Sequence, residues 1–211
     1  MTTPRRALIV VDVQNEYFSG PLEIAYPPRD ESLSNITRAI DAAEAAEMPI
    51  LFAQHTYPAE APVFAEGSTG WELHPEISTR VTDRWHRVTK QFWTVFAGTD
   101  AAEWLAAQDV DTVTIVGFMT NNCDLATAAQ AETLGLTAEV LSDATGAINL
   151  ANSAGSVTAQ QVHETLMVLF NSNFAAVAPT EEWIDAVKAG TALAKGNLVS
   201  SAVDGRAAAD G

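Results

Sequence analysis

The sequence Asp111-Thr-Val-Thr-Ile-Val-Gly117, followed by Phe118-Met-Thr-Asn-Asn-Cys123, joins a β-branched run to a helix that continues to Leu134. Such an apolar run predicts a strand buried on both faces of a parallel sheet. The turn places Cys123, the one cysteine of the chain, at the carboxyl end of this strand, pointing outward from the start of the helix. Free backbone N–H groups and the helix dipole there are expected to lower the pKa of the Cys123 thiol and to bind a developing oxyanion.

Strand and helix patterns alternate on both sides of this stretch. Five further strands are predicted over residues 6–12, 50–55, 87–91, 137–141 and 174–178. Helical patterns, one of them capped by Ser32 or Ser34, cover about 36–47, 100–105, 121–134, 157–170 and 180–189. The alternation predicts an α/β fold with a doubly wound, six-stranded, mostly parallel sheet and helices on both faces.

Composition predicts a single folded domain over residues 1–189, with an Ala/Gly/Ser-rich tail over 190–211. The chain has 211 residues, of which 47% are hydrophobic and 18% charged, as is typical of a globular protein. The tail is weakly patterned, so it is expected either to be disordered or to lie on a partner subunit. The resemblance described below implies a homo-oligomer, a dimer or a tetramer, and the Ala-rich helix after Cys123 fits either a subunit interface or packing on its own sheet.

Net charge and cysteine content limit the kinds of partner and the cellular compartment that are expected for this protein. The net charge of −16 argues against nucleic acid or an anionic membrane as a partner. The apolar run from Ala7 to Val11 is too short to span a bilayer, and no signal peptide precedes it. A single cysteine excludes an internal disulfide, so a cytoplasmic protein is expected.

Three ionisable residues follow predicted strands. They are Asp12 after the first strand, Lys90 at the end of the third and Cys123 after the fourth. Because sites in open parallel sheets form beyond the carboxyl ends of the strands, the fold can bring the three together. A thiol nucleophile needs a base to take its proton and return it to a leaving amine, and a lysine stabilises both anions. Taken singly, each residue also fits a structural role: a buried core cysteine, a turn aspartate and an exposed edge lysine.

The motifs Asp12-Val-Gln-Asn-Glu-Tyr17, Lys90 and Gly117-Phe-Met-Thr-Asn-Asn-Cys123, in this order, resemble those of the isochorismatase-like cysteine hydrolases. The likeness runs from about residue 7 to residue 187 and includes Leu141-Ser-Asp-Ala-Thr145. It implies a catalytic triad of Asp12, Lys90 and Cys123. It also implies a cis peptide between Phe118 and Met119, with the oxyanion hole formed by the N–H groups of Met119 and Cys123.

The resemblance implies a hydrolase that acts on non-peptide C–N bonds through a thioester acyl-enzyme. Asp12 would deprotonate Cys123, and the thiolate would attack an amide, carbamoyl or lactam carbonyl of a small molecule. True isochorismatases cleave an enol ether and lack the nucleophilic cysteine, so they are the alternative within the family. A non-catalytic binding protein on the same fold and a redox-sensing thiol are alternatives from other classes.

No metal and no other cofactor are expected. The nicotinamidase branch of the family holds a metal through an Asp-x-His pattern after the second strand, whereas this chain has His55 and Tyr57 at those positions. With His74 as the one further candidate, the ligand set is too small for a stable site.

The expected substrate pocket is aromatic, which favours a planar or ring-bearing amide. Trp71, in a long loop, is a candidate lid, whereas Trp93 and Phe96 fit core packing equally well. The candidate substrate-binding residues are Gln14, Tyr17, Phe18, His55, Trp71, Trp93, Phe96 and Asn122.

Overall fold

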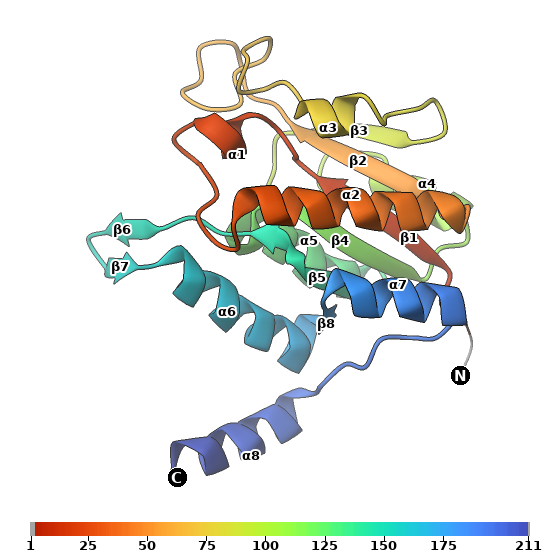
Figure 1. Ribbon diagram of the computed structural model, residues 1–211, viewed down its shortest axis with the longest axis vertical. Helices are drawn as coiled ribbons and strands as arrows, with labels where there is room; N and C mark the ends of the chain where they lie inside the picture. The colour runs from red at the N-terminus through yellow and green to blue at the C-terminus, as the bar shows by residue number, and fades with distance from the viewer. Residues whose placement is uncertain (1–2, 211) are drawn as a thin grey trace.

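A six-stranded parallel sheet forms the centre of the molecule (Figure 1). The structure, a computed structural model, describes residues 3–210. The strand order is β3-β2-β1-β4-β5-β8, and every neighbouring pair is parallel. The strands are β1 (Arg6–Val11), β2 (Ile50–His55), β3 (His86–Lys90), β4 (Thr112–Phe118), β5 (Thr137–Gly146) and β8 (Ala175–Ala178). The predicted α/β fold is therefore confirmed.

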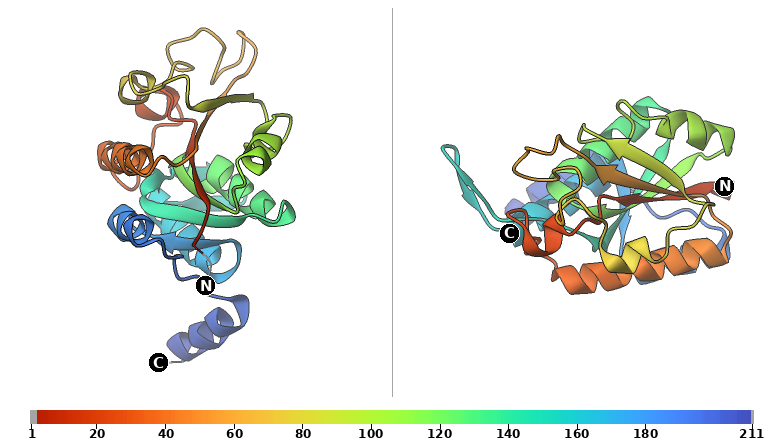
Figure 2. Two further views of the ribbon diagram at one scale, coloured as in Figure 1. Left: turned by 90° about the vertical axis from the view of Figure 1, so that its right-hand side faces the viewer. Right: turned by 90° about the horizontal axis from the view of Figure 1, so that it is seen from above.

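Helices cover both faces of the sheet, as the edge-on view in Figure 2 shows. One layer contains α2 (Arg29–Ala45) and α7 (Thr180–Ala189), whose apolar residues Ile36, Ile40 and Trp183 are fully buried. The opposite layer contains α4 (Ala101–Ala107) and α5 (Leu125–Thr133). Strands β1, β2 and β4 are buried along their whole length, which explains why their sequences are continuous apolar runs instead of alternating patterns.

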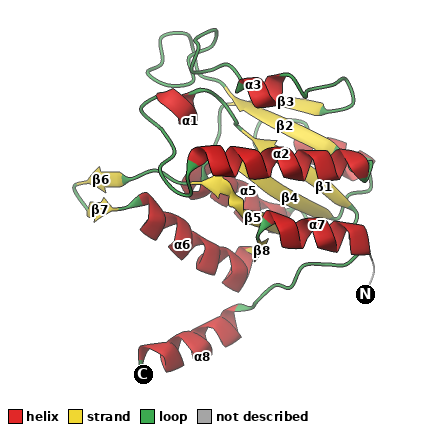
Figure 3. Ribbon diagram, viewed as in Figure 1, coloured by secondary structure: helices red, strands yellow, loops and turns green. Residues whose placement is uncertain are grey.

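The remaining elements of the described residues lie around this sheet and its two helix layers (Figure 3). They are the helices α1 (Glu16–Ser19), α3 (Pro75–Ser78), α6 (Ala159–Leu169) and α8 (Leu198–Ala209), the π-helical turns η1 (Thr120–Asp124) and η2 (Phe170–Phe174), and the hairpin strands β6 (Leu150–Asn152) and β7 (Gly155–Val157). No described helix is long and apolar enough to cross a membrane.

Gly117 allows β4 to approach β1 at the end of the sheet that carries the candidate site. Its φ is +115°, and a Cβ built on it would lie 2.1 Å from the carbonyl oxygen of Val11. Only glycine combines that dihedral with so close a backbone approach. The pair Val11–Gly117 is the last β1–β4 register pair, immediately before Asp12.

Several boundaries differ from the sequence predictions. Helix α2 begins at Arg29, directly after Pro28, so neither serine caps it; the Ser32 hydroxyl instead donates to the carbonyl of Thr145. Strand β5 continues five residues past Leu141, through a register shift against β4. The hairpin β6–β7 was not predicted. In the tail, residues 198–209 form the helix α8.

Candidate active site

The structure brings the three predicted ionisable residues together beyond the carboxyl ends of β1, β3 and β4. Lys90 Nζ lies 2.7 Å from Asp12 Oδ2 and 3.2 Å from Cys123 Sγ. All three residues are buried, each no more than 2% exposed. The three residues are far apart in the sequence, and the strand order brings them together, because β1 lies between β2 and β4 and β3 lies beyond β2.

The Asp12 backbone adopts a left-handed conformation that aspartate tolerates better than most residues. Its φ is +47°, directly after the last residue of β1. The Asp12 N–H donates to the carbonyl of Ala53, and its carbonyl accepts from the N–H of Gln14. The other carboxylate oxygen, Oδ1, has no hydrogen-bond partner among the described residues. The backbone thus fixes the carboxylate while leaving one oxygen available to a proton.

Lys90 is held as a charged ammonium at the centre of the site. Burial alone would lower its pKa, but the carboxylate of Asp12 and the neighbouring Cys123 outweigh that effect and raise the pKa above its usual value. The ammonium also contacts Nδ1 of His55 at 2.9 Å and donates to the carbonyl of Phe92 at 3.2 Å. The alternative role of an exposed edge lysine is therefore excluded.

Cys123 differs from its expected state in two respects. Its thiol is buried instead of pointing outward, and its pKa is raised, because burial and the charge of Asp12 outweigh the opposing effect of Lys90. The π-helical turn η1 begins at Thr120, so Cys123 lies inside the turn and not at a helix start. The resting residue is a thiol that needs a base at the moment of attack, a role for which Asp12 is close enough.

The carbonyl of Met119 accepts two hydrogen bonds from the turn around Cys123. The N–H groups of Asn122 and Asp124 both donate to the carbonyl oxygen of Met119, at 3.0 and 3.3 Å. The peptide between Phe118 and Met119 is cis. This arrangement fixes the backbone on either side of the thiol.

His55 is a neutral partner of Lys90. It is fully buried, and burial together with the Lys90 charge lowers its pKa to about 4, against the opposing effect of Asp12. Because the Lys90 ammonium can only donate, Nδ1 of His55 accepts, and the ring proton resides on Nε2. Nε2 has no hydrogen-bond partner among the described residues, and the ring packs against Tyr57 and Trp93.

We expect His55→Asn and His55→Leu to separate the two functions of this ring. Asparagine can present an oxygen near the position of Nδ1, whereas leucine cannot accept from Lys90. Losing a hydrogen bond to a charged group costs about 1.5–3 kcal/mol. The pH midpoint of Cys123 alkylation by iodoacetamide should therefore rise by about one unit or more in His55→Leu and little in His55→Asn. Equal midpoints in the two variants would contradict a positioning role for His55.

The residues present do not fit a metal ion. Donor atoms of Asp12, His55 and Cys123 lie within 4.8 Å of one another, as a metal would require. The Lys90 ammonium, however, contacts all three residues and occupies the position of a cation. The remaining candidate, His74, accepts the N–H of Glu76 and packs against the ring of Phe18.

Asp124, which no sequence pattern singled out, is a second buried carboxyl beside the triad. It is fully buried, and both of its oxygens have no partner among the described residues. Burial and, to a smaller degree, the charge of Asp12 raise its pKa well above the usual value, with Lys90 opposing. Burial therefore favours the neutral form of this carboxyl.

We expect Asp124→Asn to stabilise the protein at alkaline pH. A carboxyl whose pKa is raised by folding contributes stability below its unfolded pKa, and this is lost as pH rises through the folded pKa. The neutral amide removes that loss, so the variant should melt at least about 2–4 °C above the native chain at pH 8, roughly 1 kcal/mol at this size. The difference should shrink toward pH 4. A pH-independent difference, or one matched by the exposed control Asp83→Asn, would contradict this account.

Four of the expected substrate-binding residues have packing or hydrogen-bonding roles in the fold. Tyr17 and Phe96 are buried in the two core layers. Gln14 holds the backbone of two other segments in place: its side-chain amide accepts from the His55 N–H and donates to the carbonyls of His55 and Trp71. Trp71 is fixed by its indole N–H on the Thr56 hydroxyl at 2.8 Å, which does not match a free lid.

The remaining candidates lie nearer the surface. Phe18 is partly exposed and packs edge-on against Phe118, and Asn122 is partly exposed in η1. Trp93 is 50% exposed and stacks on His55, with ring centroids 5.6 Å apart. Among the predicted aromatic residues, Trp93 therefore connects the surface with the ring that holds Lys90.

His163, which the sequence pattern predicted to be an ordinary surface or helix residue, is buried in the structure. It lies on α6, is 3% exposed, and connects the Thr120 hydroxyl at 3.0 Å with the carbonyl of Ser142 at 2.9 Å. It thereby ties the first residue of η1 to β5. The preceding sequence pattern shows only an amphipathic helix, so no signal separates His163 from other helix residues.

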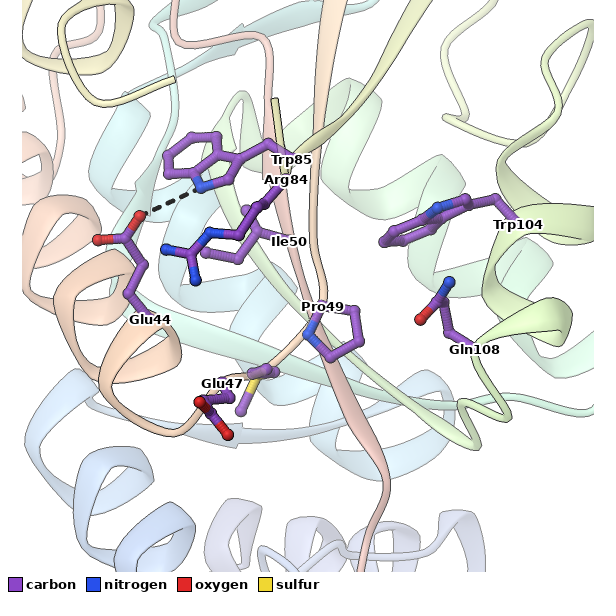
Figure 4. Close-up of a pocket in the computed structure, with 9 residues that line it drawn as sticks. Glu44, Glu47, Pro49, Ile50, Arg84, Trp85, Trp104 and Gln108 are labelled. Carbon is purple, nitrogen blue, oxygen red and sulfur yellow. Dashed lines mark hydrogen bonds between the residues drawn. The ribbon is translucent and has the colours of Figure 1, made fainter. Parts of the chain in front are cut away.

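A surface hollow of about 260 Å³ lies elsewhere in the fold (Figure 4). Pro49 and Ile50, at the amino end of β2, line it together with Trp85 and Trp104. Trp85 donates to a carboxylate oxygen of Glu44 at 3.2 Å. Because the triad lies at the carboxyl end of the strands, this hollow is not part of the candidate active site.

Comparison with known proteins agrees with the geometry. The family model of the isochorismatase domain matches residues 6–182. The crystal structure of an isochorismatase-like protein from Burkholderia xenovorans LB400 is 51% identical and covers all of both chains, with a TM-score of 0.96. The secreted isochorismatase effector Isc1 of Verticillium dahliae is 31% identical over 69% of this chain and 74% of its own. Nicotinamidase 3 of Arabidopsis thaliana is 27% identical over 80% of this chain and 82% of its own.

Proposed function

Because the chain belongs to the isochorismatase family, a family of hydrolases, we propose that it is a cysteine amidohydrolase that cleaves a C–N bond of a small molecule without a metal. The observation that carries this proposal is the contact of one buried ammonium with a carboxylate, a thiol and a neutral imidazole. In this arrangement Asp12 is the base, Cys123 the nucleophile and Lys90 the group that holds both in place.

The first half of the reaction forms an acyl-enzyme. Asp12 takes the proton of Cys123 as Sγ bonds to the carbonyl carbon, and the π electrons of the carbonyl move to its oxygen. The N–H groups of Met119 and Cys123 stabilise this oxyanion. When the carbonyl re-forms, the C–N bond breaks, and the leaving nitrogen takes the proton from Asp12, which leaves a thioester on Cys123.

The second half returns the enzyme to its resting state. Asp12 takes a proton from water, whose oxygen attacks the thioester carbon, and collapse breaks the C–S bond. The thiolate recovers the proton that Asp12 holds, and the acid product departs. Lys90 remains charged throughout, because its pKa lies above the usual value.

The substrate is a small planar amide, carbamoyl compound or lactam that enters beside Trp93. This indole is half-exposed and stacks on the ring of His55, which in turn contacts Lys90. The likeness to a nicotinamidase supports an amide over other carbonyl compounds. We place the reaction in the cytoplasm, because the single cysteine must stay reduced to act as a nucleophile.

An enol-ether hydrolysis of the isochorismatase type is the alternative. The name shared by most relatives favours it, and Asp12 could act there as an acid. The buried Cys123 in contact with Lys90 would then have no task. This contact therefore favours the amidohydrolase.

The test is amine or ammonia release from a panel of small amides, carbamoyl compounds and lactams, run beside hydrolysis of isochorismate. The proposal predicts turnover of at least one C–N substrate, abolished when iodoacetamide has alkylated Cys123. Turnover of isochorismate that survives alkylation would overturn it in favour of the alternative. Silence in every assay would favour a binding protein on the same fold.

A further inference from the structure

The C-terminal arm, residues 191–210, leaves the body of the molecule and ends in a helix that projects from it. In Figure 1, α8 lies below α6, and the edge-on view in Figure 2 shows it outside both helix layers. Leu198, Val199 and Val203 of α8 are 61%, 74% and 59% exposed, and no residue of this helix is buried. A projecting helix with this much apolar surface indicates a missing partner.

The exposed apolar residues of α8 lie on one flank. At about 100° per residue, the three fall within an arc of about 140°. Ser201, the one residue of α8 that is partly covered, lies outside this arc. The helix therefore turns its polar side toward its own body and its apolar side away from it.

The helix is not expected to persist without a partner. It has 12 residues and contains Gly205 in its interior. Isolated helices of this length are marginal in water, and a central glycine costs about 1 kcal/mol more. Its start is nevertheless well defined, because the Asn197 side chain accepts from the N–H of Ser200 at 2.9 Å.

The departure of the arm from the body is fixed at two points. Arg6 donates to the carbonyl of Thr191 at 2.7 Å, and a Cβ on Gly196 would lie 2.9 Å from the carbonyl oxygen of Asn171 in η2. The match to the Burkholderia xenovorans crystal structure covers both chains entirely, arm included. The projecting helix is therefore a feature of the fold instead of a frayed end.

From these observations we propose that α8 docks on a second copy of this chain, by reciprocal exchange of arms. Val168 and Leu169, at the end of α6 and directly before η2, are 71% and 41% exposed and form the matching seat. Gly196, where the arm leaves the body, contacts Asn171 of η2. The start of the arm and the seat therefore adjoin on one face of the molecule. A two-fold symmetric interface requires this, since the same face must both donate and accept.

Charge favours a second copy over other partners. The segment from Gly190 onward carries Lys195, Arg206, Asp204 and Asp210 and is neutral, so the whole net charge of −16 belongs to the preceding body. A neutral arm can approach another acidic body without repulsion, whereas the body repels nucleic acid and anionic lipid. Two docked helices, each about 18 Å long, bury on the order of 1,000 Å² in total, the lower range of specific interfaces.

The test is the molar mass of the full chain by light scattering after gel filtration, with charge placed on either flank of α8. We expect the native chain to have at least twice its 22.4 kDa monomer mass. Val199→Glu/Val203→Glu, the seat variant Val168→Glu, and a chain ending at Gly196 should each show at most half the native mass. Ala208→Glu, which adds one negative charge as Val168→Glu does but on the opposite flank of α8, should keep the native mass.

Two results would overturn the exchange. One is a monomeric native chain, and the other is a native mass in the truncated chain or the Val199→Glu/Val203→Glu variant. The outcome is independent of the proposed chemistry, because the arm does not contact the triad. The monomeric variants should keep the alkylation profile of Cys123, so failure of one proposal is distinguishable from failure of the other.

Discussion

Replacing Cys123 with alanine is expected to lower kcat/KM for the best C–N substrate by at least about 10⁴-fold. The loss is this large because the nucleophile and base act as one unit, and what survives is only binding and the backbone oxyanion donors. Initial rates of amine release at matched protein concentrations measure it. The thiol is 2% exposed, so the variant leaves only a small cavity and should fold.

Asp12→Asn provides the matched control for this prediction. It keeps the shape of the side chain but removes the base, and we expect a loss of similar size. Losses that multiply in the double variant would show that the two residues act separately. Full activity in Cys123→Ala would contradict the nucleophile assignment outright.

Replacing Gly117 with alanine is expected to destabilise the fold and disassemble the site together. The added Cβ would lie 2.1 Å from the carbonyl oxygen of Val11, so β1 and β4 must separate, in addition to the cost of the positive φ. We expect a loss of at least about 3 kcal/mol, which lowers the melting temperature by roughly 6–12 °C in a chain of this size. Thermal unfolding followed by circular dichroism measures it.

Gly135→Ala is the matched control for Gly117→Ala. Gly135 also has a positive φ, +73°, but no atom lies within 4 Å of a built Cβ. Its replacement should therefore cost only the dihedral strain, about 1 kcal/mol. Equal losses in the two variants would mean that strain alone, and not the contact between β1 and β4, accounts for the effect.

The sheet could be predicted from the sequence because its central strands are buried on both faces. A strand such as β4 then shows as an unbroken apolar run, which few other structures produce. The end of β5 was harder to place, because past Leu141 the strand contains Ser142 and Asp143 and passes a register shift against β4. Hairpin β6–β7 is exposed except for the partly covered Val157, so burial left no pattern in its residues.

The candidate site was predictable as a set of residues but not as an electrostatic state. Spacing after strands located Asp12, Lys90 and Cys123, and the structure brings them into contact. The direction of the Cys123 pKa depends on burial and on the distance to Asp12, neither of which is local in sequence. The buried carboxyl of Asp124 was missed for the same reason, since adjacent acidic residues are usually solvated.

Local sequence patterns also could not show which polar side chains form hydrogen bonds with the backbone. Gln14 occurs beside Asp12 in sequence and suggested substrate binding, whereas its amide is used by the backbones of His55 and Trp71. The tail gave a similar difficulty. Its small residues predicted disorder or a partner, and the structure shows an apolar flank that agrees with the second possibility.

The most direct test of the central claim is the intact mass of the protein during turnover. Acid quenching within the first turnovers of the best C–N substrate should trap a thioester, seen as the native mass plus the acyl group minus one hydrogen. Peptide mapping should place it on Cys123, and Cys123→Ala should show none. Turnover with no adduct under rapid quenching, or an adduct on another residue, would contradict the cysteine mechanism.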